Sequence, residues 1–564
     1  MDIDDTAEIP ASITVSYSDY ERETLHAAET ALGTSVDPFP EGKTVERIQT
    51  VRLDPIEDRD PLPTVLDAIH TTTKDDVVVH EVLLRVGDPY RRVIADESAR
   101  NIRKFARVSI VIVAAMRGSA PDRVRVVVIT KDVWSLQPDF DISATSGGIE
   151  AMLIELEEQN LAGRQQSLAG SMLLKPKSVA VGLGYIAPRF TGRWLSLVAN
   201  GALIFNRDDG HVEGSVGETR IERPLFSTRT DWAWLSGLAW TDEVARRYTN
   251  AEVATFVGTT GTVPWAFRSR KIEYTASTTR SFGWARKNDF TFGAYASHDL
   301  YRAQVPLPEF ERAYVPVGES RVAPFGEWRS YSNDFLRIID YESLALQEDV
   351  RLGYDVVVRA YPVFRALGST RNLAGARAAV SYTARLGDGF VRGIVDTLHE
   401  HDFGADRISD ASILADFRVV TPRTPAGRLV FDTTATNRWR NYLNRQLVLG
   451  GEDRLRGYPT RFFQGKDLVA MNLELRSRPV ELFECQFGGA LFYDVGAAAT
   501  GWDNIHPAQS VGFGLRAVFP QIDRAVLRFD VGFPIADDRV DPVSFFVTFG
   551  QAFKAAAIPP PLGP

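Results

Sequence analysis

The sequence predicts a mostly β protein in which a small α+β domain precedes a large transmembrane antiparallel β-barrel. From Pro138 to Phe553 nearly all segments alternate apolar and polar residues, as strands with one buried face do. The longest apolar run, Ile110–Met116, is far shorter than the roughly 18 residues that indicate a membrane helix. Glycine (43), phenylalanine (32), tyrosine (17) and tryptophan (10) are abundant, which fits strands bordered by aromatic girdles.

The composition limits the classes of function. A mean hydropathy of -0.13 resembles that of a soluble protein, but a barrel strand of about 9–11 residues needs only one apolar face. The net charge of -9 argues against a nucleic-acid partner, which would require a basic patch. Met1–Asp5 lack the basic region and apolar core of a signal peptide, so we expect no signal peptide in this chain.

Residues 1–43 are predicted to be an N-terminal extension with one helix. Ser18, with Glu21 three residues later, has the spacing of a capping box for a helix over Asp19–Leu32, and Gly33 is suited to end it. The simplest interpretation of the extension is a mobile tail.

Residues 44–134 are predicted to form a small α+β domain with the order β-α-α-β-β. A Gly-Asp-Pro-Tyr turn at 87–90 precedes the second helix, whose apolar residues share one face. The predicted elements are a strand over Val45–Leu53, helical material within Leu62–Leu84, a helix over Arg92–Phe105, and strands over Val108–Met116 and Val124–Val133.

Residues 135–553 are predicted to form the barrel, and residues 554–564 a C-terminal tail. In Arg524–Phe533 the polar Arg528 and Asp530 fall on one face and the apolar residues on the other. Several soluble sandwiches could share this alternation, but no change of composition separates such units. Six tryptophans near predicted strand ends fit an interfacial girdle: Trp134, Trp194, Trp265, Trp284, Trp439 and Trp502.

Two motifs in the C-terminal third carry the functional signal. Leu449–Pro459 reads LGGEDRLRGYP, an Arg-Gly-aromatic loop tip, and Phe492–Gly496 reads FYDVG on a strand. A carboxylate facing lipid would be costly, so the alternation places Asp494, and likewise Glu474, on the lumen side. Arg456 then has two candidate acceptors, and its planar guanidinium can hold both in fixed directions.

This pair of motifs resembles the BamA/TamA superfamily of outer-membrane assembly and translocation barrels. The resemblance extends from about residue 44 to 553 and is strongest in the C-terminal third. It implies a barrel of about 16 strands, although strand-like segments number nearly twenty, because bulges can split one strand into two on reading. It also implies that residues 44–134 are a single POTRA domain, the periplasmic module of the superfamily; an unrelated small α+β domain is the alternative.

The resemblance also implies the functional residues. The loop folds back into the lumen, where its arginine meets the aspartate on the barrel wall. Leu455 stands where the superfamily often has Val or Ile, and the Pro-rich tail departs from the usual aromatic ending. Carried onto this chain, the loop motif is Leu455, Arg456, Gly457 and Tyr458, its lumen partners are Asp494 and Glu474, and the wall motif is Phe492, Asp494 and Gly496.

The sequence predicts no enzyme, cofactor or metal site. It contains no nucleophile elbow, phosphate-binding loop or paired catalytic carboxylates. The string His399-Glu400-His401-Asp402 offers metal-ligand types without the spacing of a helical site, and a solvated loop is the simpler interpretation.

The resemblance implies a protein of the bacterial outer membrane, with its POTRA domain in the periplasm, that assembles or inserts outer-membrane proteins. Its partners would be unfolded polypeptides, outer-membrane lipids and periplasmic accessory proteins. Val45–Leu53 or Val108–Met116 could accept an incoming strand, and the seam between strands near Asp139–Thr145 and Val543–Phe553 could open laterally. The alternatives are a secretion pore of the two-partner type, favoured by a strongly paired seam and a wide lumen, or a passive barrel.

Overall fold

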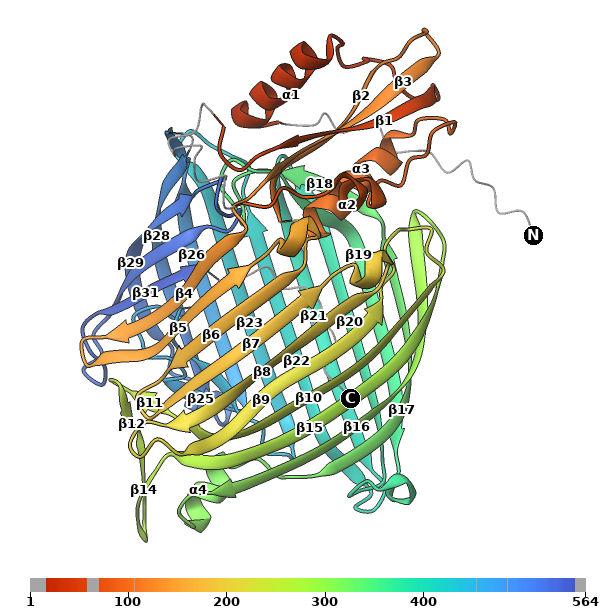
Figure 1. Ribbon diagram of the computed structural model, residues 1–564. Helices are drawn as coiled ribbons and strands as arrows, with labels where there is room; N and C mark the ends of the chain where they lie inside the picture. The colour runs from red at the N-terminus through yellow and green to blue at the C-terminus, as the bar shows by residue number, and fades with distance from the viewer. Residues whose placement is uncertain (1–16, 58–69, 106, 453, 484, 553–564) are drawn as a thin grey trace.

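The computed structural model describes residues 17–57, 70–105, 107–452, 454–483 and 485–552. A large barrel carries a small α+β domain across one end (Figure 1). Among the described residues, no helix has the length and apolar character needed to cross a membrane.

The N-terminal helix α1 spans Asp19–Leu32 and has the predicted boundaries. Ser18 Oγ accepts a hydrogen bond from the Glu21 backbone N–H, and the Glu21 carboxylate accepts one from Ser18 N–H, which completes the capping box. Gly33 ends the helix in the left-handed conformation, with φ of 61°. Tyr20 and Ala28 of α1 pack on Ile110 and Ile112 of the sheet. The mobile-tail interpretation is therefore wrong for the described part of the extension.

The small domain has the predicted order β-α-α-β-β. Its sheet has the order β1-β3-β2, with β1 parallel and β2 antiparallel to β3. Helices α2 and α3 cover one face of the sheet and α1 covers the other. Most of the helical material predicted before residue 70 lies outside the described residues. The elements are β1 Thr44–Leu53, α2 Asp75–His80, α3 Arg92–Phe105, β2 Val108–Arg117 and β3 Arg123–Asp132.

The barrel is closed and antiparallel, and the described residues contribute twenty strands to it. Two further segments are continuations, because β18 extends β17 along β19, and β27 extends β26 along β28. The expected number of about 16 is therefore wrong. The strand-like segments are separate strands rather than bulge-split halves.

The first ten strands of the barrel are β4 Leu136–Thr145, β5 Gly148–Glu158, β6 Ser167–Leu174, β7 Ser178–Ala187, β8 Ser196–Asn206, β9 Val212–Arg223, β10 Trp232–Arg246, β15 Ala266–Phe282, β16 Arg286–Ala303 and β17 Ser320–Ser332, continued by β18 Asp334–Ile338. The others are β19 Glu348–Val363, β20 Leu373–Leu386, β21 Gly389–Asp402, β22 Arg407–Val420, β23 Gly427–Asn441, β26 Asp467–Ser477 with β27 Val480–Leu482, β28 Cys485–Ala499, β29 Ala508–Val518, β30 Leu527–Pro534 and β31 Ser544–Phe549.

Short elements lie at the end of the barrel away from the small domain (Figure 1). They include a helix and two hairpins, and a third hairpin is described below with the site. Their bounds are β11 Tyr248–Thr249, β12 Glu252–Val253, β13 Thr255–Gly258, β14 Gly261–Pro264 and α4 Pro308–Tyr314.

The alternation of the strands sorts their side chains as predicted. On β30, Arg528 and Asp530 are buried, whereas Phe533 on the opposite face is 38% exposed. The outward face of the wall carries large exposed apolar side chains, such as Leu183 and Phe292. The six predicted tryptophans all lie close to an end of a barrel strand. Trp194 and Trp284 pack on the small domain and Trp265 packs on α4, so these three are not part of an interfacial girdle. The apolar outer surface is the arrangement of a barrel surrounded by lipid.

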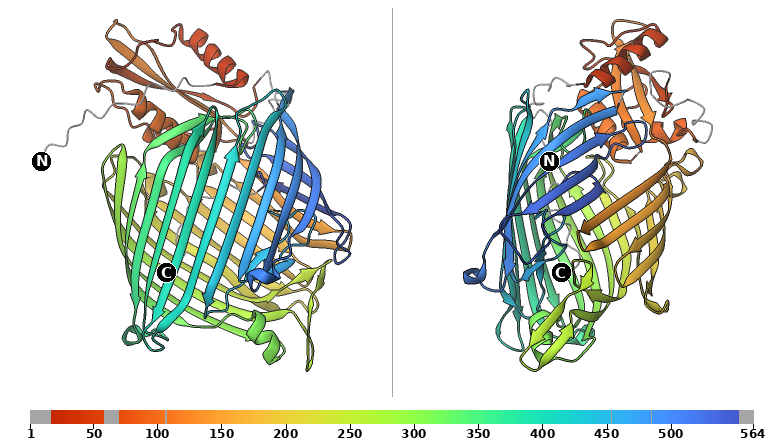
Figure 2. Two further views of the ribbon diagram at one scale, coloured as in Figure 1. Left: turned by 180° about the vertical axis from the view of Figure 1, so that it is seen from behind. Right: turned by 90° about the vertical axis from the view of Figure 1, so that its left-hand side faces the viewer.

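The first and last strands, β4 and β31, close the barrel over a short ladder. Only four residue pairs join them, from Ser544↔Thr145 to Val547↔Ile142, whereas β30 and β31 share six. Leu136–Phe140, the first half of β4, lies beyond the register with β31. Figure 2 shows the two strands side by side on the face turned toward the viewer at right. The seam was predicted between these strands, although Phe553, the last residue of that prediction, lies outside the described residues.

The last strand ends early because the chain turns inward. Gly550 has φ of 97°, a conformation that favours glycine, and Gln551 and Ala552 are buried. Gln551 accepts a hydrogen bond from Arg516 on the inner wall, and Ala552 packs beside Tyr341.

The small domain is tied to the mouth of the barrel by charged contacts. Arg103 of α3 bonds Asp349 of β19 at 2.6 and 3.0 Å, and Arg189 after β7 bonds Glu81 at 2.6 and 2.8 Å. Burial raises the pKa of the Glu81 carboxyl, and the Arg189 guanidinium opposes that shift. These contacts hold the domain across the opening.

Residues 339–347, between β18 and β19, fold against the inner wall at the same mouth and are called the mouth segment below. Its carbonyl groups accept hydrogen bonds from three arginines, namely Arg428, Arg476 and Arg524. Gln347 also donates to Glu21 of α1 at 3.0 Å. The mouth segment therefore connects the barrel wall to the N-terminal helix.

Candidate functional site: an arginine-centred cluster in the barrel lumen

The loop between β23 and β26 enters the barrel from the end opposite the small domain. Its stem is a two-stranded hairpin of β24 Leu447–Leu449 and β25 Phe463–Gly465. Residues 450–462, of which 453 is outside the described part, form the tip. Thr460 N–H donates to Glu150 of β5, just beyond the seam, at 3.0 Å, and Arg247, after β10 on the opposite wall, donates to Phe462 O. The loop thus crosses the lumen rather than lying outside it.

Arg456 at the loop tip is fully buried and binds Asp494 of β28. The Arg456 backbone N–H donates to Asp494 Oδ2 at 3.1 Å, Nε donates to the same oxygen at 2.9 Å, and Nη2 donates to Oδ1 at 3.0 Å. Asn472 of β26 donates to Asp494 Oδ1 at 2.8 Å. Both the direction and the position of the guanidinium are fixed, because a bidentate pair and a backbone bond share one carboxylate.

Two more carboxylates meet Arg456 on the same side of the lumen. Its Nη1 donates to Glu474 Oε2 of β26 at 2.5 Å and to Asp530 Oδ2 of β30 at 3.2 Å. The structure therefore brings together the three residues expected from the sequence and adds Asp530. The signal for Asp530 was present in the alternation of Arg524–Phe533, but nothing local in that strand connects it with residue 456.

Arginines on the wall surround the three carboxylates. Arg476 donates to Glu474 at 2.8 Å, Arg516 donates to Asp530 at 2.5 Å, and Arg528 lies 3.4 Å from Asp530. Positive and negative groups thus alternate around Arg456, and all of these side chains are buried. In such an environment each unpaired charge would be strongly destabilising.

The wall motif FYDVG provides shape as well as charge. The centre of the Phe492 ring lies 3.5 Å from the Arg456 guanidinium carbon, a stacking cation–π contact. The ring has room because position 512 on β29 is glycine; a Cβ there would lie 2.2 Å from Phe492 Cζ. Gly496 similarly leaves space for the Leu449 side chain of the loop stem. The motif therefore fits the loop along its length.

Gly457 permits the close approach of the loop to the wall. Its φ of 111° is a conformation that L side chains rarely adopt, and a Cβ would lie 2.9 Å from Ser510 Cβ. On the wall, a Cβ on Gly532 would lie 2.5 Å from Gly457 N. A pair of glycines thus faces each other where loop and wall meet.

Leu455 and Tyr458 anchor the loop tip by packing, and both are completely buried. Tyr458 packs against Phe462 and Phe463, and its hydroxyl donates to Gln509 O at 3.4 Å. The apolar cluster also includes Leu449, Leu468, Ala470, Ala498 and Ala508.

A second loop arginine, Arg454, was not singled out in the sequence. It bonds Asp432 of β23 and lies 3.4 Å from Asp416 of β22, while Asp432 also accepts from Arg418 at 2.6 Å. These two arginines pin the loop tip to β22, β23, β26, β28 and β30, on the side of the barrel wall that leads up to the last strand. Thr460 of the same tip contacts β4 and β5, on the other side of the seam.

The cluster holds the loop against the barrel wall and lacks the groups needed to make or break covalent bonds. It contains no nucleophile beside a base, and its carboxylates are occupied by arginines. The string His399–Asp402 lies at the end of strand β21, so the solvated-loop interpretation is wrong. Its Glu400 is buried and accepts hydrogen bonds from Arg321 and Tyr361. Among the described residues, the carboxylates of Asp139, Glu155 and Glu157 lie within 4.8 Å of one another near the seam, which alone indicates no metal.

Comparison with known proteins gives one sequence relative. No family model matches the chain. A putative outer membrane protein assembly factor from Treponema pallidum (strain Nichols) is 24% identical over 172 residues, which are 30% of this chain and 20% of the relative. The match thus spans about a fifth of the relative's length. It confirms the resemblance to the BamA/TamA superfamily seen in the motifs.

Among solved structures, BamA from Haemophilus ducreyi lacking POTRA domains 1–3 aligns with 96% of this chain and 95% of its own, at 12% identity and a TM-score of 0.37. CdiB from Escherichia coli aligns with 94% of this chain and 84% of its own, at 11% identity and a TM-score of 0.45. CdiB from Acinetobacter baumannii aligns with 94% and 81%, at 10% identity and a TM-score of 0.39.

Proposed function

We propose that this protein is an outer-membrane assembly factor that receives unfolded polypeptides and inserts them through its barrel seam. In this proposal residues 135–553 form the transmembrane barrel, and residues 44–134 are a POTRA domain in the periplasm. Residues 1–43 support that domain, and residues 554–564 are a tail. The partners are unfolded outer-membrane polypeptides, membrane lipids and periplasmic accessory proteins. The protein acts without enzymatic chemistry or a cofactor.

The observation that carries this proposal is the short ladder between β4 and β31. Each lost residue pair removes backbone hydrogen bonds and cross-strand contacts, so a four-pair ladder opens at a lower cost than its neighbours. The unmatched edge of Leu136–Phe140 then offers a template for an incoming strand, because main-chain pairing accepts almost any sequence. Burial of the new apolar strands in lipid drives insertion, so no nucleotide is needed.

The Arg456 cluster gives the barrel a fixed framework while the seam moves. Arg456 ties the loop to β26, β28 and β30, and β30 is the neighbour of β31. Opening between β31 and β4 leaves these Arg456 bonds in place, but it must break or stretch the contacts of Thr460 with Ser143 and Glu150 across the seam. The wall behind the seam keeps its shape.

The small domain has one edge suited to an arriving strand. Ser35–Asp37 already pair with the end of β2, through Asp37 N–H to Ala115 O at 2.9 Å and Arg117 N–H to Ser35 O at 3.0 Å. By contrast, the outer edge of β1 from Glu46 to Leu53 has no backbone partner among the described residues. Of the two strands expected to accept a client, we therefore favour β1.

A disulfide lock of the seam tests the proposal. Ala144 and Phe545 are paired across it, so cysteines at both positions, in a Cys485→Ser background, can be oxidised to close it. The matched control locks β22 to β23 through the pair Ala415 and Ala435. We expect the oxidised seam variant in liposomes to lose acceleration of client-barrel folding and to regain it on reduction, while the control stays active.

If the seam-locked protein inserts clients as fast as the wild type, the lateral mechanism is wrong. Arg456→Ala is tested in the same assay, and we expect it to lose acceleration because the framework behind the seam loosens.

The second candidate function is a dedicated secretion pore with the loop as its plug. The twenty-strand wall favours it, because barrel diameter grows with strand number and a wider lumen suits passage of a chain. Export through the lumen would tolerate the seam lock but would require the loop to leave. Conductance of the seam-locked protein before and after removal of residues 450–462 therefore separates the two functions.

A further inference from the structure

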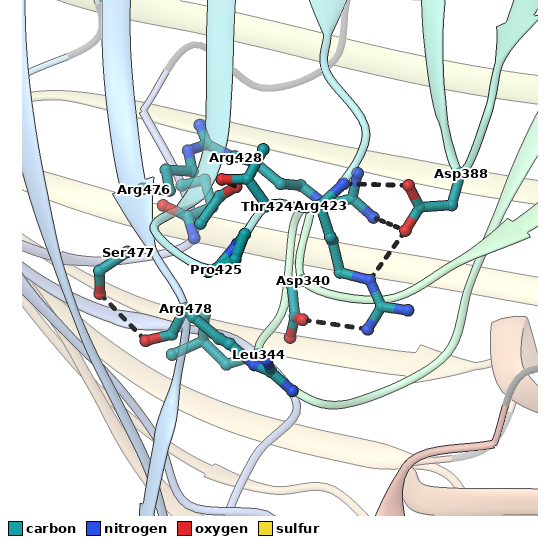
Figure 3. Close-up of a pocket in the computed structure, with 12 residues that line it drawn as sticks. Asp340, Leu344, Asp388, Arg423, Thr424, Pro425, Arg428, Arg476, Ser477 and Arg478 are labelled. Atoms are coloured by element: carbon teal, nitrogen blue, oxygen red, sulfur yellow. Dashed lines mark hydrogen bonds and ion pairs between the residues drawn. The ribbon is translucent and has the colours of Figure 1, made fainter.

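A cavity of about 350 Å³ lies at the barrel mouth that carries the small domain, on the inner side of the wall. Its lining comes from five separate parts of the chain, one of which is Gln551 after β31, and Figure 3 shows the charged side chains of the other four. The β22–β23 turn contributes Arg423 and Arg428, the end of β26 contributes Arg476 and Arg478, the β20–β21 turn contributes Asp388, and the mouth segment contributes Asp340.

The lining carries more positive than negative groups. Arg423 bonds Asp388 at 2.8 Å and lies 3.6 Å from Asp340, and Arg428 lies 3.2 Å from the same Asp388 oxygen. Arg476 is paired with Glu474 behind the cavity. Arg478 is exposed and has no ionic partner among the described residues. Even with Glu474 counted, the guanidinium groups outnumber the carboxylates.

Besides Arg478, the cavity contains a second arginine, Arg428, whose hydrogen-bond donors are only partly satisfied. Its side chain is 1% exposed, and its two terminal nitrogens donate to Thr421 O at 2.7 Å and Ile339 O at 2.9 Å. Its Nε has no hydrogen-bond acceptor among the described residues. Buried donors are rarely left in this state, so an acceptor that enters the cavity would be stabilised there.

We propose that this cavity binds a phosphate group, held by Arg478 and Arg428 beside Arg423. Arg478 can offer its guanidinium fork to the phosphate oxygens, Arg428 can offer its Nε–H, and the surplus positive charge matches an anion. The cavity is within the usual size of small-molecule sites of roughly 300–1,000 Å³, so the phosphate can be that of an ester. A soluble phosphate ester and a lipid headgroup share this chemistry.

The bound group would strengthen the closed mouth. It would lie between the paired strands β23 and β26 and the mouth segment, which is held to them by hydrogen bonds from Arg428 to Ile339 O and from Arg476 to Tyr341 O. Because the cavity is complete only while the mouth segment lies against these strands, the ligand would stabilise that arrangement by mass action. This inference does not depend on the proposed function, since it concerns the mouth alone.

The test measures binding to the full chain in a phosphate-free detergent. Inorganic phosphate, glycerol 3-phosphate and a short-chain phosphatidylglycerol are titrated at constant ionic strength, by calorimetry and by thermal unfolding. Arg478→Gln changes an exposed side chain without ion pairs, and Arg478→Glu reverses its charge. Arg385→Gln is the matched control, because Arg385 is exposed at the same rim and does not line the cavity.

We expect saturable binding with a rise in the unfolding temperature, weakened about tenfold by Arg478→Gln through the loss of one charge-assisted contact. Arg478→Glu should abolish it and Arg385→Gln should leave it unchanged. Binding of glycerol 3-phosphate identifies a soluble ligand, and binding of phosphatidylglycerol alone identifies a lipid. Absence of saturable binding up to about 10 mM of every probe, or equal weakening in the control, would overturn the proposal.

Discussion

Replacing Arg456 by methionine should release the loop from the barrel wall. Methionine keeps most of the volume but removes the two side-chain hydrogen bonds to Asp494 and one each to Glu474 and Asp530. The third bond to Asp494 comes from the backbone N–H and survives only if the loop stays in place. The change therefore tests whether charge or packing fixes the loop.

The free-energy cost of the substitution depends on the partners that each carboxylate keeps. Glu474 keeps Arg476, and Asp530 keeps Arg516 and Arg528. Asp494 keeps Asn472 as its side-chain partner. Breaking a buried pair by removing one partner costs roughly 3–5 kcal/mol, and here the cost should arise mainly from the stranded charge of Asp494. Arg456→Met combined with Asp494→Asn should recover about half of it.

Hydrogen exchange of the loop amides is the suitable assay, because opening of the loop is local and leaves the barrel folded. The reporter is Gly451, whose N–H donates to Tyr458 O within the tip. A loss of 3–5 kcal/mol should accelerate its exchange by roughly two to nearly four powers of ten. Acceleration below tenfold, or no recovery in the double variant, would refute the assignment of Asp494 as the stranded charge.

Four further changes test other parts of the structure. Gly457→Ala should destabilise the loop by roughly 1–3 kcal/mol in the same exchange assay, because φ of 111° and a Cβ 2.9 Å from Ser510 are both unfavourable. Gly512→Val should displace the Phe492 ring and loosen the loop, whereas Gly170→Ala on β6, where nothing lies within 4 Å, should not. Asp349→Ala should raise the open-state frequency in planar bilayers, because it frees Arg103 at the mouth; Arg385→Gln should not. Hydrogen bonds from Ser119 and Arg125 lower the pKa of Glu46 to about 2 from its ordinary 4.5, so its contribution to stability is complete above about pH 4.5 and is lost toward pH 2. Glu46→Gln should therefore reduce the change in the unfolding temperature of the small domain between about pH 4.5 and pH 2.

Elements with a local cause could be predicted from the sequence. Ser18, Glu21 and Gly33 fix both ends of α1, because the cap groups are within a few residues of the ends they satisfy. Strand faces followed from alternation, and alternation alone placed Asp494 and Glu474 on the lumen side. Contacts between residues that are brought together only when the barrel closes could not be predicted. Asp530 meets Arg456 from a strand 74 positions away in sequence, and its neighbours give no sign of that partner.

The predicted number of strands was wrong for a related reason. Each segment has the pattern of a strand, but how many strands share one ring depends on pairing over the whole chain. The resemblance to the superfamily implies about 16 strands, whereas the nearly twenty strand-like segments in the sequence agree better with the barrel observed. The mouth segment was equally hidden. Its N–H groups at 341, 342 and 343 donate to the nearby Glu348, but its carbonyl groups at 339, 341 and 347 accept hydrogen bonds from arginines far away in sequence.

The number of strands explains why the lumen contains so much folded chain. Side chains can fill the inside of a barrel of about eight strands, and wider ones leave open space. A twenty-strand wall therefore needs inserted segments if it is to be closed, and this chain supplies the loop tip from one end and the mouth segment from the other. Both are held by arginine because only long donors on the wall can reach backbone and carboxylate groups toward the axis. The loop tip that helps to close the wide lumen also bridges the short seam, because Arg456 holds it to β26, β28 and β30 while Thr460 contacts β4 and β5. A variant that loosens the loop should therefore weaken the seam as well.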